Sequence, residues 1–142
     1  KTLWDYVTYR QRSFVGWALP DRICFRTPTT LKYRGKIQQM FSLEAILPAL
    51  CRRIHMLDCF EGLECEMLKW EGIYPKVRTE SSEQIAVYRY SSTQNQKMPL
   101  RGIRGGMQLE KIPDDLILLL LAGEVTHIGK NTSFGFGRYR LF

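Results

Sequence analysis

The fold of this chain is decided by residues 76–112, "KVRTESSEQIAVYRYSSTQNQKMPLRGIRGGMQLEKI". Residues 76–92 and 98–112 each predict a strand, and the polar stretch 92–97 that joins them predicts a β-hairpin. The second strand contains three glycines, at positions 102, 105 and 106. Glycines inside a strand predict a bulge or a close approach of a neighbouring backbone.

A helical pattern precedes this hairpin. Residues 41–60 carry apolar side chains at helical spacing, at positions 43, 46, 47, 50, 54, 57 and 60. Ser42 is the predicted N-cap of this helix. Pro48 lies inside the pattern, where it is expected to remove a hydrogen bond or kink the helix. Residues 61–68 predict a second, weaker helical piece.

The remaining segments predict one more helix and two more strands. Acidic residues follow Pro113 and favour the first turn of a short helix over 113–122, which Gly123 ends. Residues 22–27 predict a strand that ends at Pro28, and the residues after it continue in an extended form. The last residues, 134–142, predict a terminal strand.

The predicted order is β-α-β-β-α-β. The simplest α+β solution is the ferredoxin-like arrangement, a four-stranded antiparallel sheet with two helices on one face. We expect residues 21–142 to form this domain. Residues 1–20 are interpreted as a lead-in, either the end of a preceding domain or the linker from it. The uncovered sheet face is where such domains often bind nucleic acid.

Positive charge is segregated along the chain. The net charge is +7 over 142 residues, which favours an anionic partner, most commonly nucleic acid. Acids concentrate within residues 58–83. Three other segments, 22–43, 84–109 and 125–142, contain no acid and carry these cations: Arg22, Arg26, Lys32, Arg34, Lys36, Arg89, Lys97, Arg101, Arg104, Lys130, Arg138 and Arg140. One face of the domain is therefore expected to be basic.

Cysteine spacing and hydropathy predict neither a metal site nor a membrane anchor. The four cysteines form no Cys-x-x-Cys pair and have no metal-ligand spacing with the two histidines. The apolar run 116–122 is too short to span a bilayer. We expect no cofactor, thiols in a reducing compartment, and a cytoplasmic location.

The stretch "THIGKNTSFGFGRYR" (residues 126–140) combines three glycines and three cations with no acid. It is not a Walker A loop, because Glu124 and Asn131 occupy two of the required positions and a strand follows. A dinucleotide fingerprint is excluded because Arg140 stands where glycine or alanine is required. Its centre is similar to the RNP1 string of RNA-recognition modules, but Phe134 replaces the cation and Arg138 the stacking aromatic.

The same stretch resembles the glycine-rich loop of the CRISPR repeat-RNA endoribonucleases, members of the repeat-associated mysterious protein superfamily. That loop follows the pattern G-h-G-x5-G-h-G, with h apolar, between the last helix and the last strand; here it spans residues 127–137. The resemblance extends, in family order, to "ICFRTPTTLKYRGK" (23–36), "CRRIHML" (51–57) and "AVYRYSSTQNQKMPLRGIRG" (86–105). The chain thus resembles the C-terminal domain of these enzymes.

The residues themselves suit an RNA-binding loop. Glycines let a ribose-phosphate strand approach the backbone and can present N–H groups to an anion, and cations attract phosphates. Gly129 and Lys130 are interpreted as functional, whereas Gly135 and Gly137 equally fit a strand that passes a bulky helix. The predicted RNA-binding residues are Gly129, Lys130, Asn131, Thr132, Ser133, Gly135, Gly137, Arg138, Arg140, Arg89, Lys97, Arg101 and Arg104. Tyr88 and Tyr90 share a strand face and suit either base stacking or sheet packing.

The resemblance implies a metal-independent cleavage of RNA. In that reaction the 2′-hydroxyl attacks the adjacent phosphate, one side chain removes its proton, another protonates the leaving 5′-oxygen, and cations stabilise the phosphorane. His127 replaces the first glycine of the loop pattern, and its ordinary pKa of about 6.5 suits acid–base work, so it is the candidate catalytic residue. Family members usually carry their histidine in an N-terminal domain. His55 is interpreted as a boundary histidine, and Arg52 and Arg53 as a solvated helix face.

Two other interpretations stay open. The chain could be a non-catalytic member of the same superfamily that holds guide RNA in an effector complex. It could instead be a ferredoxin-like small-molecule sensor or oligomerisation module. The expected partners are CRISPR repeat RNA, single-stranded or hairpin, and other CRISPR-associated proteins, with a homodimer as a further possibility and no membrane.

Overall fold

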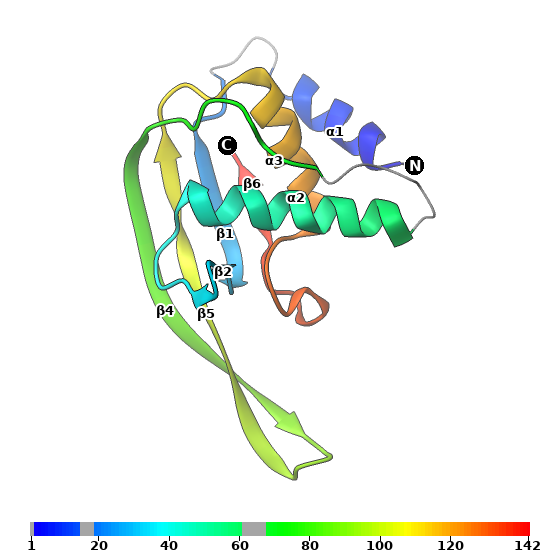
Figure 1. Ribbon diagram of the computed structural model, residues 1–142, viewed down its shortest axis with the longest axis vertical. Coiled ribbons are helices and arrows are strands. Elements are labelled where there is room, and N and C mark those ends of the chain that lie inside the picture. Colours follow the sequence, from blue (N-terminus) through cyan, green and yellow to red (C-terminus); the bar gives the residue numbers. More distant parts are fainter. Residues whose placement is uncertain (1, 15–18, 61–67) are drawn as a thin grey trace.

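The computed structural model describes residues 2–14, 19–60 and 68–142. Their elements follow in this order: α1 (Leu3–Arg12), β1 (Arg22–Thr29), β2 (Lys32–Tyr33), β3 (Lys36–Ile37), α2 (Leu43–Phe60), β4 (Val77–Ser91), β5 (Gln96–Leu109), α3 (Asp114–Thr126), a single 3₁₀ turn (Thr132–Phe134) and β6 (Tyr139–Leu141). Figure 1 shows their arrangement, with the paired strands β4 and β5 reaching far beyond the rest of the chain.

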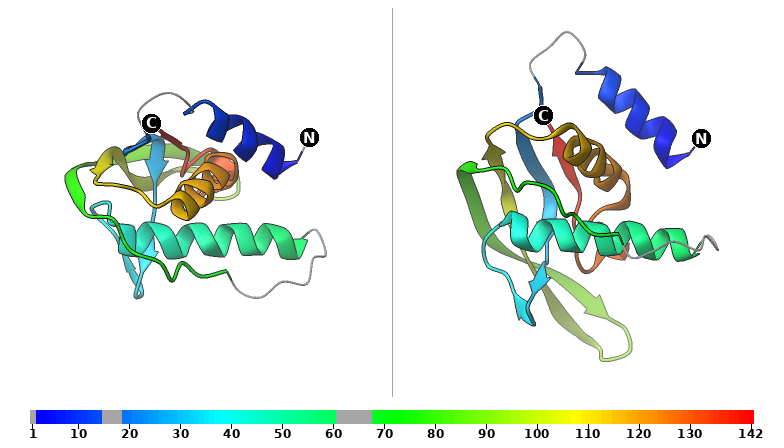
Figure 2. Two further views of the ribbon diagram at one scale, coloured as in Figure 1. Left: turned by 90° about the horizontal axis from the view of Figure 1, so that it is seen from above. Right: turned by 45° about the horizontal axis from the view of Figure 1, so that its top comes forward.

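One antiparallel sheet organises the domain. Its strands lie in the spatial order β4-β5-β1-β6, and helices α2 and α3 lie together against one face (Figure 2). Leaving aside α1 and the short β2–β3 pair, the chain order is β-α-β-β-α-β, which is the ferredoxin-like arrangement. The predicted fold class is therefore confirmed.

Helix α2 forms where its periodicity predicts it. Ser42 caps it, because the Ser42 Oγ accepts from the backbone N–H of Ala45 at 3.3 Å. Pro48 is tolerated within the continuous helix, since the hydrogen bond that it removes would have used the carbonyl of Glu44, the exposed residue of the first turn. Residues 61–67 of the predicted second helical piece lie outside the described residues.

The core fills the space between the helices and the sheet. Fully buried side chains come from α2, from α3 and from the inner face of the central strands, among them Ile46, Leu50, Leu116, Leu120, Ile23 and Ile103. Phe25 of β1 stacks on Phe41, with ring centroids 4.1 Å apart. Burial of these side chains stabilises the fold by roughly 2 kcal/mol each before entropy is counted.

Helix α3 is longer than predicted. Gly123 does not end it; the helix continues to Thr126. The reason for this glycine is packing, because a Cβ at position 123 would lie 2.0 Å from the Tyr139 hydroxyl and 2.5 Å from the Leu50 side chain. Tyr139 uses the space to donate a hydrogen bond to the carbonyl of Leu120 at 2.5 Å. The glycine thus lets β6 pack closely on α3.

Strand β1 runs past Pro28, where the sequence predicts that it ends. Its pairing with β5 skips from Phe25–Gly105 to Thr29–Ile103, so three residues of β1 face one residue of β5. Pro28 lies in this bulge, where no ladder N–H is required. The bulge is therefore in β1 and not in β5, whose pairing with β4 is regular from Thr79 to Ser91.

The glycines of β5 serve close backbone approach. A Cβ on Gly105 would lie 2.0 Å from the Ser81 carbonyl oxygen, and one on Gly106 would lie 2.4 Å from that of Ile23. The predicted hairpin is confirmed, and its connection is the four-residue turn 92–95. The terminal strand is shorter than predicted, because residues 132–137 form turns before β6 begins.

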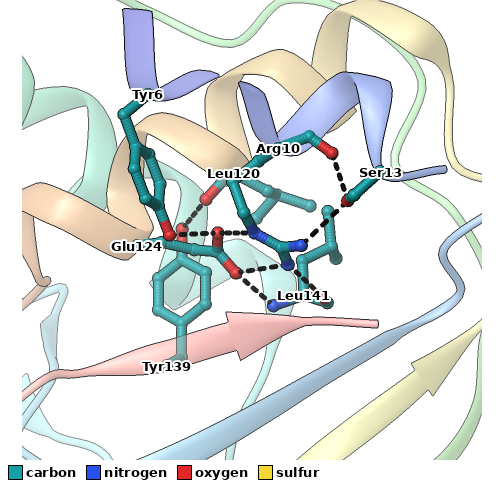
Figure 3. A network of polar contacts seen from close by, with 7 residues as sticks. All are labelled: Tyr6, Arg10, Ser13, Leu120, Glu124, Tyr139 and Leu141. Atoms are coloured by element: carbon teal, nitrogen blue, oxygen red, sulfur yellow. Dashed lines mark hydrogen bonds and ion pairs between the residues drawn. The ribbon is translucent and has the colours of Figure 1, made fainter. Parts of the chain in front are cut away.

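Helix α1 joins the domain through a buried polar network (Figure 3). The Arg10 guanidinium donates to both oxygens of Glu124 on α3, at 2.8 and 3.2 Å, and to the carbonyl of Leu141 at 2.8 Å. Glu124 also accepts from the Tyr6 hydroxyl at 3.1 Å and from the Leu141 N–H at 2.7 Å. One carboxylate therefore connects α1, α3 and β6.

Removing Arg10 should be costly. We expect Arg10→Met to lower the free energy of unfolding by about 3 kcal/mol, because the buried Glu124 charge loses its partner. Arg12→Met on the exposed side of the same helix is the control, with a change of about 0.5 kcal/mol or less. Urea unfolding measures both, and equal losses in the two variants would contradict the structural role of the Arg10–Glu124 pair.

Candidate nucleic-acid interface

The glycine-rich loop, residues 127–137, is closed by backbone hydrogen bonds at its base. The Ile128 N–H donates to the carbonyl of Gly137 at 3.1 Å, and the Gly137 N–H donates to the carbonyl of Pro28 at 3.0 Å. On the other side, the Lys130 N–H donates to the carbonyl of Thr30 at 2.9 Å. These bonds hold the loop against the end of β1, so its position is set by the sheet.

The three loop glycines differ in surroundings. A Cβ at Gly129 would lie 2.3 Å from the Thr30 carbonyl oxygen, and one at Gly137 would lie 1.8 Å from that of Ile128. Gly135 has a φ of +85° and nothing within 4 Å of its Cβ position. Gly129 and Gly137 thus have packing roles, and Gly135 is the open position that a ligand backbone can approach closely.

His127 follows α3 in a conformation that suits glycine. Its φ is 59° and its ψ is 174°, and its N–H donates to the carbonyl of Gly123 at 2.9 Å. Residues other than glycine are strained at such a positive φ, and this strain is found mainly at functional sites. Burial lowers the pKa of His127, and the charges of Arg138 and Arg53 lower it further. The imidazole is therefore neutral at pH 7.

The long hairpin contacts the loop. The Arg89 guanidinium lies over the Phe134 ring, 4.4 Å from its centroid. Tyr88 and Tyr90 are 66% and 60% exposed, so most of each side chain is open to solvent and accessible for stacking. Lys97 lies opposite Tyr90 in the β4–β5 register. The structure thus brings Arg89 to the loop and places Lys97 closer to the hairpin turn.

Arg101 and Arg104 do not share a surface. Their partners in the regular β4–β5 register are Ala86 and Glu83, and residues three apart in a regular strand face opposite sides. The β4–β5 register has no bulge between these two predicted RNA-binding residues, so they lie on opposite faces of the hairpin. A single RNA strand on one face of the hairpin can contact one of them.

Arg138 and Arg140 flank the buried Tyr139 and are exposed. Together with Arg26 of β1 they line a hollow of about 430 Å³ at the β6 edge, whose wall includes Tyr6 and Glu124. Arg26 extends the predicted interface. The acid-free segment 22–43 already contained this signal, since Arg26 alternates with the buried Phe25 in a strand adjacent to β6.

Four cations outside the predicted site residues lie beside the loop. Lys32, Arg34, Arg52 and Arg53 line a cleft together with Gly129 and Lys130. Arg53 is not merely solvated, because its Nε donates to the carbonyl of Thr126 at the end of α3, at 3.0 Å. Helical spacing alone indicated that Arg52 and Arg53 are near the surface but not which loop they face.

The described residues contain neither a cluster of metal ligands nor a membrane-spanning helix. Within that part of the chain, no three side chains of His, Cys, Asp or Glu gather closely enough to hold a metal ion. No helix in the same residues is both long and apolar enough to cross a bilayer.

The antiparallel sheet, the glycine-rich loop and the surrounding cations define a ferredoxin-like domain with a basic surface, which is typical of domains that bind nucleic acid. The family model of the CRISPR-associated endoribonuclease Cas6 matches residues 23–139. The chain belongs to this family, as its sequence resemblance predicts. Comparison with curated protein sequences gave no match.

Solved structures share the fold. A Cas6 product complex is 23% identical, with a TM-score of 0.52, over 93% of this chain and 55% of that one. A partial Cas6-RT-Cas1–Cas2 complex is 12% identical, with a TM-score of 0.56, over 99% of this chain and 25% of that one. The chain thus spans about half the length of the Cas6 protein it matches.

Two glycine substitutions test the loop geometry. Gly137→Ala should destabilise the fold by about 2 kcal/mol or more, since its Cβ would collide with the Ile128 carbonyl at a positive φ. Gly135→Ala shares the positive φ but not the collision, and should cost about 1 kcal/mol. Thermal unfolding compares them, and equal losses would contradict the packing role of Gly137.

Proposed function

We propose that the chain is the RNA-binding domain of an endoribonuclease that cleaves precursor CRISPR RNA within its repeats. The family match over residues 23–139 carries this proposal. The closed glycine-rich loop with Lys130 and the neighbouring Arg89 supports it, because these cations can attract phosphates. The exposed Tyr88 and Tyr90, on the opposite face of β4 from Arg89, can stack on bases. Other CRISPR-associated proteins are the proposed partners of the complete protein, and a homodimer stays a prediction.

The proposed reaction is a transesterification without a metal ion. The RNA 2′-oxygen forms a bond to the adjacent phosphorus, the bond to the 5′-oxygen breaks, and a 2′,3′-cyclic phosphate and a 5′-hydroxyl result. The 2′-hydroxyl proton goes to a base and the 5′-oxygen takes a proton from an acid. Cations such as Lys130 and Arg138 stabilise the additional negative charge of the phosphorane.

His127 is proposed as the base of this step. Its lowered pKa keeps the imidazole able to accept a proton at neutral pH, and Arg138 lies near enough to influence its titration. The strained backbone of His127 gives a second reason, because a glycine there would relieve the strain. A proton acceptor beside a phosphate-binding cation is the arrangement that the chemistry requires.

RNA binding is tested with the 142-residue chain and single-stranded repeat RNA at several salt concentrations. We expect log Kd to depend linearly on log salt, and Arg89→Gln and Lys130→Gln each to reduce the slope by about 0.7. Lys111→Gln is the control, because Lys111 is exposed between β5 and α3, at the end of the sheet away from the hairpin tip. Binding without salt dependence would favour a sensor or oligomerisation module.

Cleavage is tested with the protein expressed from its complete reading frame. We expect cutting at one repeat position in EDTA, and a rate at least about 100-fold lower for His127→Gly. The rate of the parent should fall as the pH drops below the His127 pKa, because a protonated imidazole cannot accept a proton. The same variant should be more stable by about 1 kcal/mol, since glycine relieves the positive φ.

The two outcomes of this experiment separate the proposals. Parental-rate cleavage by His127→Gly would remove His127 from the chemistry and leave the nuclease in place. If the complete parent protein does not cut the repeat RNA at one defined position, the result would instead favour a non-catalytic subunit that holds guide RNA.

A further inference from the structure

A cationic cleft lies on the helix side of the glycine-rich loop. It has a volume of about 510 Å³ and is walled by the β2–β3 hairpin, helix α2 and the start of the loop. Its charged lining residues are all positive: Lys32, Arg34, Arg52, Arg53 and Lys130. A volume of this size falls in the usual range of ligand sites, about 300–1,000 Å³.

These five cations are not neutralised within the described part of the chain. The ion pairs there are Arg10–Glu124 and Arg22–Asp21, and neither involves the cleft. Cations held together without acids repel one another and destabilise the folded state, and a bound anion removes that repulsion. The cleft therefore has the electrostatics of an anion site.

Arg34 supplies a second, independent observation. It and Gly35 form the turn between β2 and β3, with φ values of 51° and 76°. Such two-residue turns favour Asn-Gly or Gly-Gly, and an arginine at the first position is strained. The Arg34 guanidinium lies 5.2 Å from the Tyr33 ring centroid, exposed at the edge of the cleft. A strained cation at the entrance of a cationic cleft points to a role in ligand binding.

The cleft is continuous with the loop. Lys130 is a residue of both, and its N–H is bonded to the carbonyl of Thr30, two residues before β2. On α2, Arg52 and Met56 are one helical turn apart and face the same side, and Arg53 is anchored to the end of α3. The loop also contacts the β4–β5 hairpin, through Phe134 and Arg89.

From this arrangement we infer that the cleft binds the phosphodiester backbone of the RNA strand after it has crossed the glycine-rich loop. The strand would run from the β4–β5 hairpin over the loop and into the space between the β2–β3 hairpin and α2. Arg34 and Arg52 would contact phosphates from opposite walls, and Lys130 would contact the phosphate between loop and cleft. The inference rests on the proposed RNA-binding function and assigns it a second surface.

The test uses three variants of the 142-residue chain with single-stranded repeat RNA. Arg34→Asn replaces the strained arginine with asparagine, which tolerates the positive φ of this turn. The variant should therefore be at least as stable as the parent, and yet bind RNA several-fold more weakly. Arg52→Gln should weaken binding similarly, each variant lowering the slope of log Kd against log salt by about 0.7. Lys36→Gln is the matched control, because Lys36 is exposed on the same short hairpin but does not line the cleft.

The outcomes distinguish this inference from the proposed function. If Arg89→Gln weakens binding while Arg34→Asn and Arg52→Gln bind as tightly as Lys36→Gln, the cleft is not part of the RNA path and the inference fails alone. If the parent chain shows no salt-dependent binding of RNA, both the inference about the cleft and the proposed RNA-binding function fail.

A final arm separates an RNA strand from a small anion. Inorganic phosphate and a 5′-mononucleotide are titrated against the parent and against Arg52→Gln. We expect the RNA to bind at least 100-fold more tightly than either small anion, because a strand engages several cations together. Equally tight binding of the mononucleotide would make the cleft a small-anion site and overturn the inference.

Discussion

The buried carboxylate of Glu124 holds the ends of the glycine-rich loop in place. It lies in the last turn of α3, just before the loop begins, and it accepts the N–H of Leu141 in β6, just after the loop ends. Arg10 supplies the opposite charge and also donates to the carbonyl of Leu141. A buried charge is tolerated only when it is paired and fully hydrogen-bonded. Helix α1 is therefore part of the support of the loop.

This arrangement changes how the loop glycines are understood. Gly129 and Gly137 let the loop close on β1 and on itself, so their first role is to fix the shape of the loop. The groups left for a ligand are the open backbone at Gly135 and side chains such as Lys130. A glycine pattern can thus specify a binding surface indirectly, by setting where the neighbouring cations lie.

Periodicity in the sequence was sufficient to predict the sheet, the hairpin and both helices of the ferredoxin-like unit. The errors arose where tertiary packing determines the local structure. Gly123 has the signal of a helix end, yet it is a close contact with Tyr139 and Leu50. The turn at Arg34 has no asparagine or double glycine, so the β2–β3 hairpin had no turn signal. Without that hairpin, the cationic cleft could not be predicted.

The outer part of the β4–β5 hairpin depends on the loop as well. Between the hairpin turn and Ile103, the first core residue of β5, the two strands have mostly exposed side chains, and an isolated two-stranded ribbon is marginally stable in water. Two described contacts steady it there: the Arg89 guanidinium lies over Phe134 of the loop, and the Thr30 hydroxyl donates to the carbonyl of Arg101 at 2.5 Å. A ligand that binds both elements would add to these contacts. Under the proposed function, RNA binding at the loop would therefore also order the hairpin, because the loop, itself held through Glu124, contacts the hairpin through Phe134.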